Sequence, residues 1–147
     1  IGFGQTQTIV ISNAQSYYYV CPPHVSSGMK GVIIANTPPQ LNTYVPDDNF
    51  EQALIALGYD NILDDSVLTS NINSLSALDV SNVNITDLTG IQDFISIQIL
   101  WCYNNNLSVL DLSYNTSLTI LYCYDNQLTT LDVSTNTALT YLGCGYN

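Results

Sequence analysis

Three cysteines of this sequence recur at a constant interval, and cysteine supports a wide range of chemistry. Cys102, Cys123 and Cys144 follow one another at intervals of 21 residues. A thiol can act as a nucleophile, form half of a disulfide or bind a metal ion. The residues around each cysteine distinguish these chemistries from a purely structural role.

Each cysteine lies in the same longer motif. Residues 118–131 read LxxLxCxxNxLxxL, residues 97–110 fit this pattern with Ile at its first position, and residues 139–147 begin it again. The segment LDLSYNTSL likewise returns as LDVSTNTAL, and a degenerate copy of the repeat covers residues 75–88. A period of this length with this pattern is the leucine-rich-repeat signature, in which each coil buries its apolar side against its neighbours.

The repeat predicts a structural role for its cysteines and asparagines. The alternating Leu-x-Cys pair indicates a short strand with one face inward. Cysteines stacked on parallel strands point the same way, about 4.8 Å apart, and do not converge as a disulfide requires. We interpret them as small buried hydrophobic residues, with a metal-binding thiol ladder as the alternative. The asparagines are expected to turn inward and bind free backbone groups. This predicted structural ladder comprises Cys102, Cys123, Cys144, Asn105, Asn126 and Asn147.

The predicted fold is an α/β-type solenoid. It is a right-handed leucine-rich-repeat coil with short parallel strands, an N-terminal helical cap and a mostly irregular convex side. Residues 1–43 are predicted to be an N-terminal extension with short strands, residues 44–74 the helical cap, and residues 75–147 the repeats, incomplete at the C-terminus. The chain is therefore expected to continue in the natural protein.

The cap is predicted from apolar residues at helical spacing. Phe50, Ala53, Leu54 and Leu57 fit one face of a helix, and Gly58 is placed to end that helix in a left-handed turn. Residues 63–68 are predicted to form a second short helix. Such a cap would cover the leucines at the end of the solenoid.

The amino-acid composition excludes some classes of binding partner. The chain has 147 residues, of which 46% are hydrophobic and 9% are charged, with a formal net charge of −11. One lysine and no arginine exclude nucleic acid and disfavour anionic membranes. No apolar run approaches the length of a transmembrane helix, so no membrane insertion is expected. The opening segment, Ile1 to Thr6, could be the remnant of a signal peptide or an ordinary first strand.

A resemblance to a known family covers residues 43–147. The stretch TYVPDDNFEQALIALGYD, followed by ILDDSVLTSNI and LDVSNVNITDLTGIQDF, resembles the cap and first repeat of secreted leucine-rich-repeat proteins of the Bacteroidetes group. The later LxCxxNxLxxLDLSxNTxL units resemble the 21-residue repeats of that group. The resemblance implies export to the cell surface or medium and a role in binding or adhesion. It assigns no catalytic residues.

Side chains that alternate with the inward residues are expected to line the concave face of the sheet. Aromatic rings with polar tips make effective contact surfaces, so we predict that a protein or a glycan binds there. Two alternatives are that the rings only stabilise the sheet, or that a subunit or residues 1–43 cover them. The predicted ligand-binding residues are Trp101, Tyr103, Tyr122, Tyr124 and Tyr141, with Asn104 and Asp125 at the rim.

Carboxylates offer weaker candidates for chemistry. Asp60, Asp64 and Asp65 could form a calcium cluster, but they lack the spacing of a calcium loop and we interpret them as cap and turn residues. Asp111 and Asp132 recur with the repeat and are predicted to form Asx-type turns. We therefore expect no metal and no other cofactor.

Cys21 and His24 are the remaining candidates. They stand in the segment Cys-Pro-Pro-His, which we interpret as a rigid turn with an incidental histidine, since no third catalytic group or oxyanion site is visible. The conclusion from sequence is an extracellular binding or interaction module without enzymatic activity. A structural, adhesin-like or self-associating element is the first alternative, and an enzyme that uses Cys21 and His24 is the second.

Overall fold

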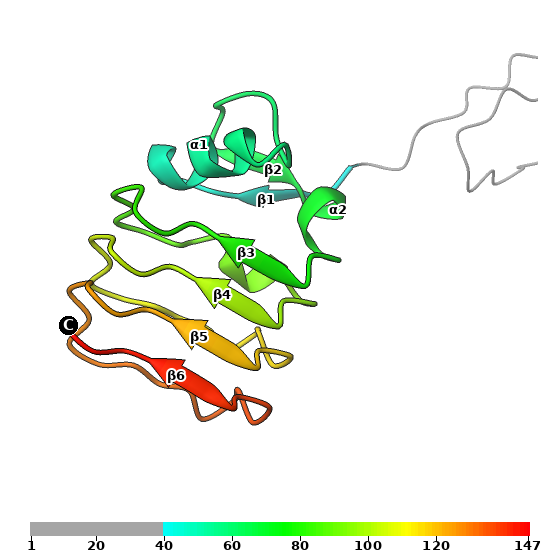
Figure 1. Cartoon of the computed structure of the whole chain (residues 1–147). Helices are drawn as coiled ribbons and strands as arrows, with labels where there is room; N and C mark the ends of the chain where they lie inside the picture. Colours follow the sequence, from blue (N-terminus) through cyan, green and yellow to red (C-terminus); the bar gives the residue numbers. More distant parts are fainter. Residues whose placement is uncertain (1–39) are drawn as a thin grey trace, which may run out of the picture. The chain divides into compact units, whose positions relative to one another are not determined.

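The computed structural model describes residues 40–147, which form a coil of stacked turns (Figure 1). One three-residue strand comes from each turn: β3 (Ala77–Asp79), β4 (Ile99–Trp101), β5 (Ile120–Tyr122) and β6 (Tyr141–Gly143). These strands make one parallel sheet in the order β3-β4-β5-β6. The prediction of a leucine-rich-repeat solenoid with short parallel strands is confirmed.

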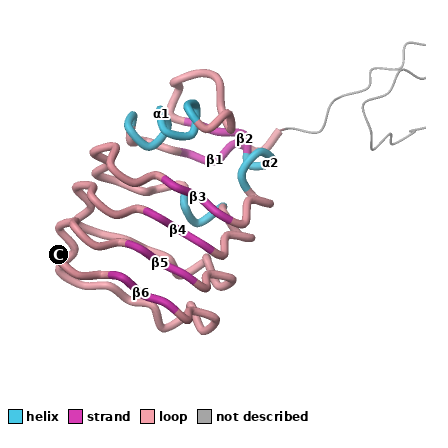
Figure 2. Tube along the Cα trace, viewed as in Figure 1, coloured by secondary structure: helices cyan, strands magenta, loops and turns pink. Residues whose placement is uncertain are grey.

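The segments that return from one strand to the next are almost entirely loop (Figure 2). The short 3-10 helix η2 (Ile91–Asp93) lies between β3 and β4. The sheet stays in register although the first spacing is 22 residues and the later ones are 21, because the extra residue is accommodated outside the strands. Leu78, Leu100, Leu121 and Leu142 therefore face one another across the sheet.

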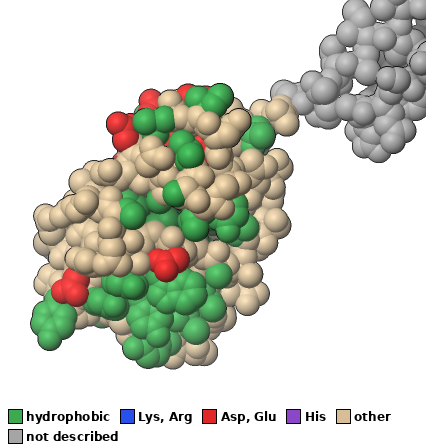
Figure 3. Space-filling view, turned by 45° about the horizontal axis from the view of Figure 1, so that its top comes forward, with side chains coloured by type: hydrophobic (Ala, Val, Ile, Leu, Met, Phe, Trp, Pro, Cys, Tyr) green, Lys and Arg blue, Asp and Glu red, His purple; other side chains and the backbone are tan. Residues whose placement is uncertain are grey.

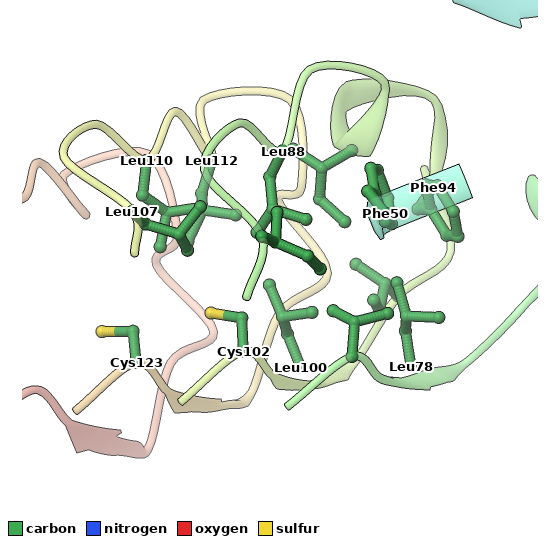
Figure 4. Close-up of a cluster of buried hydrophobic side chains, with 14 of the residues drawn as sticks. Phe50, Leu78, Leu88, Phe94, Leu100, Cys102, Leu107, Leu110, Leu112 and Cys123 are labelled. Carbon is green, nitrogen blue, oxygen red and sulfur yellow. The ribbon is translucent and has the colours of Figure 1, made fainter. Parts of the chain in front are cut away.

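The core of the solenoid is filled by one set of inward side chains from every turn. Leu100 and Leu121 have no exposed surface. Figure 4 shows Cys102 and Cys123 beside Leu107, on the same inward side as Leu100. In the last turn Leu142 is 40% exposed, because β6 has a neighbouring strand on one side only. Stacking, and not the single turn, therefore provides the apolar burial.

The cap combines a strand pair with two helices. Strand β1 (Asn42–Tyr44) pairs antiparallel with β2 (Ser66–Leu68), and the helices are α1 (Asp48–Ala56) and α2 (Thr69–Ile72). Helix α1 buries Phe50 and Leu54, and the ring of Phe50 stacks on Phe94 at 6.2 Å between centroids. The predicted helix with Phe50 and Leu54 on its inner face is confirmed.

The left-handed turn at Gly58 is also confirmed, since its φ is +81°. The predicted second helix over residues 63–68 is wrong, because Ser66–Leu68 is strand β2. Glu51 gives the physical reason. Its buried carboxylate accepts the backbone N–H groups of Asp64, Asp65 and Ser66 at 2.9–3.0 Å, which draws this segment away from helical hydrogen bonding. The short helix α2 begins only after the strand.

Asp47 joins the cap to the first repeat. One carboxylate oxygen accepts the N–H groups of Asn49 and Phe50 and so caps α1. The other oxygen accepts the N–H and hydroxyl of Thr86 and the N–H of Asp87. Burial raises the pKa of Asp47, but these hydrogen bonds outweigh it and hold the pKa below its ordinary value.

Candidate functional site

The cysteine ladder is present, and its members differ in exposure. Cys102 and Cys123 are completely buried free thiols, which confirms their interpretation as small hydrophobic residues. For Cys144 the prediction of burial is wrong, because this free thiol is exposed on the last turn. Within residues 40–147 no three His, Cys, Asp or Glu side chains are grouped so that they could hold a metal ion.

Burial also determines the reactivity of the two inner thiols. Burial raises the pKa of the Cys102 thiol, and the neighbouring Cys123 raises it further. Burial raises the pKa of Cys123 to about 12. A thiol in this state has almost no thiolate at neutral pH and is not a nucleophile.

This difference predicts selective labelling. In a Cys21→Ser background we expect a maleimide or disulfide reagent at pH 7 to modify Cys144 at the rate of an ordinary thiol. Cys102 and Cys123 should react at least about a hundredfold more slowly, because they are inaccessible and protonated. Mass spectrometry of labelled peptides, with and without denaturant, measures the rates. Equal rates for Cys123 and Cys144 in the folded protein would contradict the buried ladder.

The asparagines of the ladder hold successive turns together. The Asn126 amide nitrogen donates to the carbonyls of Cys102 and Cys123 at 3.0 and 3.2 Å, and its oxygen accepts the N–H of Leu107 at 3.0 Å. Asn105 and Asn147 make the equivalent bonds in their own turns. The predicted inward role of the asparagines is confirmed, with Asn147 more exposed than the other two.

A second asparagine ladder was missed by sequence reasoning. The Asn115 amide donates to the carbonyls of Ile91 and Phe94, and the Asn136 amide donates to those of Leu112 and Asn115. Both asparagines are buried. The signal was available, since both stand at the same place in LDLSYNTSL and LDVSTNTAL. The side chains of both asparagine ladders bind backbone groups inside the coil, so the outward face of the strands is formed by other residues.

The strand face carries the predicted aromatic residues side by side. Trp101 on β4 is opposite Tyr122 on β5, which is opposite Gly143 on β6. A Cβ atom on Gly143 would lie 3.2 Å from Cδ1 of Tyr122, so glycine at this position allows the Tyr122 ring to lean over β6. Figure 3 shows hydrophobic side chains gathered into a patch on this side of the molecule.

The tyrosines are stacked into one continuous cluster. Tyr103 and Tyr124 are parallel, with ring centroids 4.6 Å apart. Tyr122 contacts Tyr141 at 4.8 Å and meets Tyr124 edge-on at 6.4 Å. Burial raises the pKa of both Tyr122 and Tyr124, so their hydroxyls stay neutral donors at physiological pH. We call Trp101, Tyr103, Tyr122, Tyr124 and Tyr141 the aromatic face.

The two predicted rim residues follow the strands at equivalent positions. Asn104 and Asp125 have φ values of +53° and +52°, a left-handed conformation that Asn and Asp tolerate. The Asn104 amide donates to Oδ1 of Asn82 at 2.6 Å. Asp125 is exposed, and among residues 40–147 its carboxylate accepts no hydrogen bond. The rim therefore offers one free carboxylate to a ligand.

The remaining candidate carboxylates have local roles in turns and not at a binding site. Asp64 accepts the hydroxyl of Ser66, and residues 40–147 contain no group of three His, Cys, Asp or Glu side chains that could hold a metal ion. Asp111 and Asp132 accept the N–H groups two residues ahead, at Ser113 and Ser134, as Asx-type turns require. These bonds lower the pKa of both aspartates and confirm their prediction as turn formers.

The first residues of the chain match a known family. Residues 1–36 match copper binding proteins of the plastocyanin/azurin family. They include Cys21 and His24 and lie outside the residues that the structure describes. Sequence reasoning did not consider Met29 beside these two residues, although thiolate, imidazole and thioether together are a donor set for copper.

The remainder of the chain is similar to internalins. Internalin J of Listeria monocytogenes is 39% identical over 88 residues, which are 60% of this chain and 10% of the relative. The solved functional domain of InlJ, which includes a cysteine ladder, matches with a TM-score of 0.63 and 40% identity over 71% of this chain and 24% of that one. Internalin InlF of the same organism shares the fold, with a TM-score of 0.64 and 22% identity over 72% of this chain and 33% of that one.

These similarities have clear limits. The chain spans about a tenth of the length of the curated relatives it matches, and the matched relatives come from Listeria, so an origin in Bacteroidetes stays a prediction. Within residues 40–147 no helix is long and apolar enough to cross a membrane. The described residues are a leucine-rich-repeat solenoid similar to the one in internalins.

Proposed function

We propose that the solenoid is a secreted or cell-surface interaction module, and that its aromatic face binds a partner protein or a glycan. The observation that carries this proposal is the continuous cluster of four tyrosine rings, with Trp101 on the neighbouring strand beside Tyr122. Four of these rings are partly exposed and Tyr141 is 49% exposed, whereas the inward Leu100 and Leu121 of β4 and β5 are fully buried. No enzymatic activity is proposed for the solenoid.

The physical character of the cluster supports contact with another molecule. The rings are held by their neighbours, so a ligand would order few additional side-chain torsions on binding. Each ring presents an apolar face, and the tyrosine hydroxyls and the indole N–H add donors at its edge. A fixed surface of this kind suits recognition of a protein segment or a sugar ring.

The test uses one pair of variants and a matched control. Ligands are first selected for the wild-type chain from a glycan array and a peptide-display library. Trp101→Ala and Tyr122→Ala should each weaken a selected ligand at least tenfold, measured by calorimetry, because truncation of an aromatic hot-spot residue typically costs about 2 kcal/mol or more. Tyr114→Ala, which removes a 69% exposed tyrosine away from the strands, should change nothing. Selected ligands that are indifferent to Trp101 and Tyr122 would contradict the proposal.

A structural or self-associating element is the alternative function. It is favoured by the same cluster, since ring stacking across strands also stabilises a sheet. In that case Trp101→Ala would dissociate an assembly or lower stability without affecting a ligand. Sedimentation of the wild-type chain and of this variant, together with urea unfolding, distinguishes the alternative from the binding module.

We further propose that residues 1–36 contribute to a copper site, on the strength of their match to the plastocyanin/azurin family. Cys21, His24 and Met29 would supply a thiolate, an imidazole and a thioether, which are donors that suit copper. Copper sites of this donor type use two imidazoles, and His24 is the one histidine of this sequence. Bound copper would supply one-electron redox chemistry at these residues.

Copper titration of the whole chain tests this second proposal. We expect a thiolate-to-copper absorption band that Cys21→Ser abolishes. Cys144→Ser is the matched control and should leave the band unchanged, because Cys144 belongs to the repeats. A band that persists in Cys21→Ser would overturn the copper assignment, and so would the absence of any band when free imidazole is supplied as the second nitrogen ligand.

A further inference from the structure

The distribution of charged residues indicates the charge of the molecule that binds the aromatic face. All twelve acidic residues of the chain lie within residues 40–147, whereas the single lysine and the single histidine, Lys30 and His24, precede them. Residues 40–147, the cap and the repeats together, therefore carry twelve carboxylates and no basic side chain, and all of the carboxylates except those of Asp47 and Glu51 are at least partly exposed. Such a surface attracts cations over a distance and repels anionic ligands, including acidic glycans.

Two of these carboxylates border the aromatic face. Asp79 on β3 is the registered neighbour of Trp101 and is exposed. Among the described residues, its carboxylate accepts hydrogen bonds from Ser81 alone. Asp125 follows Tyr124 and is free on the other border. Figure 3 shows acidic side chains at the edge of the hydrophobic patch. Trp101, Tyr103 and Tyr124 thus lie between two exposed carboxylates, and the other two rings continue to one side of them.

Based on the proposed binding function of this face, we propose that its partner is an extended protein segment that carries arginine or lysine side chains. Cations bind over the faces of Trp and Tyr, with arginine the more frequent partner, and each carboxylate can pair with a guanidinium group at the border. A neutral sugar would use the rings but leave both carboxylates without a counterpart. The combination of rings and carboxylates therefore favours the cationic peptide.

The geometry of the sheet sets the spacing of the cations. Asp79 and Asp125 are two strands apart, and Asp125 stands three residues beyond the position level with Asp79. With about 4.8 Å between strands and about 3.3 Å per residue, the two Cα atoms are about 14 Å apart. An extended peptide covers this distance in about four residues. Two arginines four positions apart would reach both borders while the peptide backbone crosses the rings.

The experiment uses a defined probe and an internal reporter. The probe is a synthetic peptide with two arginines four positions apart in a glycine and serine background, and its control carries citrulline in both places. Trp101 is the single tryptophan of the chain, so its fluorescence reports occupancy of the aromatic face directly. We expect saturable quenching or enhancement by the arginine peptide, at least tenfold weaker binding of the citrulline peptide, and weaker binding at high salt.

Asparagine variants distinguish binding of the peptide by Asp79 and Asp125 from its attraction to the overall negative charge of the protein. Asp79→Asn and Asp125→Asn should each weaken the arginine peptide at least threefold, since the amide keeps the size and the Oδ1 acceptor of the carboxylate. The paired variant Asp111→Asn with Asp132→Asn removes two charges from the returning segments of the coil and should have less effect than either single change. An equal effect of this control pair, equal binding of the citrulline peptide, or no binding of the arginine peptide would overturn the inference.

The same measurements keep this inference apart from the proposed function. If uncharged ligands selected on the wild-type chain depend on Trp101 and Tyr122 but the arginine peptide does not bind, the aromatic face is a binding site and its cationic partner is refuted. If no ligand of any kind depends on these two residues, both proposals fail.

Discussion

Replacing Glu51 by alanine is expected to destabilise the folded protein by about 3–5 kcal/mol, the cost of removing several hydrogen bonds to a buried charged group. The Glu51 side chain is fully buried, and its Oε1 accepts the N–H groups of Asp64 and Ser66 while its Oε2 accepts that of Asp65. Alanine leaves these three backbone donors without partners and opens a cavity beside β2. Urea unfolding, monitored by circular dichroism, measures the loss in the free energy of unfolding.

Two control variants give the prediction its specificity. Glu51→Gln retains one oxygen for two of the three donors but turns an amide N–H₂ toward the third, so an intermediate loss is expected. Asp48→Ala removes a carboxylate from the same first turn of α1 without removing any of the bonds to residues 64–66, and should cost less than about 1 kcal/mol. If Glu51→Ala proves as mild as Asp48→Ala, the carboxylate does not hold the cap together.

The cap also shows where local sequence patterns fail. Residues 63–68 contain apolar residues and acids that favour a short helix, yet Ser66–Leu68 is a strand. The deciding contacts come from Glu51, more than ten positions earlier, and from the pairing of Val67 with Thr43. Such contacts have no signature in the segment itself, whereas α1 was predictable because its apolar spacing and its Asp47 cap are both local.

The repeats were predictable for the opposite reason. A period of 21 residues places each Leu, Cys and Asn against its equivalent in the next turn, so the sequence alone indicated the inward residues and the residues of the aromatic face. Periodicity did not indicate that Tyr122 leans over Gly143, or that Cys144 is exposed at the end of the stack. The position of the Tyr122 ring and the exposure of Cys144 both depend on which residues the neighbouring turn contributes. The repeat pattern is the same in every turn and carries no information about these differences.

The proposed copper donors have no signal in the repeat, because they stand outside it. Cys21 and His24 suggest catalysis first, which needs a third group that this sequence does not show. Met29 has no polar or charged side chain and was not counted among candidate ligands. A search for soft donors of copper, thiolate with imidazole and thioether within a few residues, would have selected all three.

The asparagine ladder permits a second prediction with a large effect. Replacing Asn126 by alanine is expected to cost about 2–4 kcal/mol, because one buried amide serves the backbone of two successive turns. The change leaves the buried N–H of Leu107 without a partner. It also removes one of the two amide donors from each of the carbonyls of Cys102 and Cys123, which keep Asn105 and Asn147 as donors. Chemical unfolding of the variant and the wild-type chain under identical conditions gives the difference in stability.

Asn147 provides the matched comparison, since it makes the same kinds of bonds in the last turn: to the carbonyls of Cys123 and Cys144 and from the N–H of Leu128. Its side chain is exposed, so water can replace the lost bonds and Asn147→Ala should cost less than about 1 kcal/mol. Equal costs at the two positions would mean that the stability of a turn does not depend on the turns stacked against it. A clear excess at Asn126 would show that each inner asparagine stabilises the interface between neighbours, which is how a solenoid with such short strands remains folded.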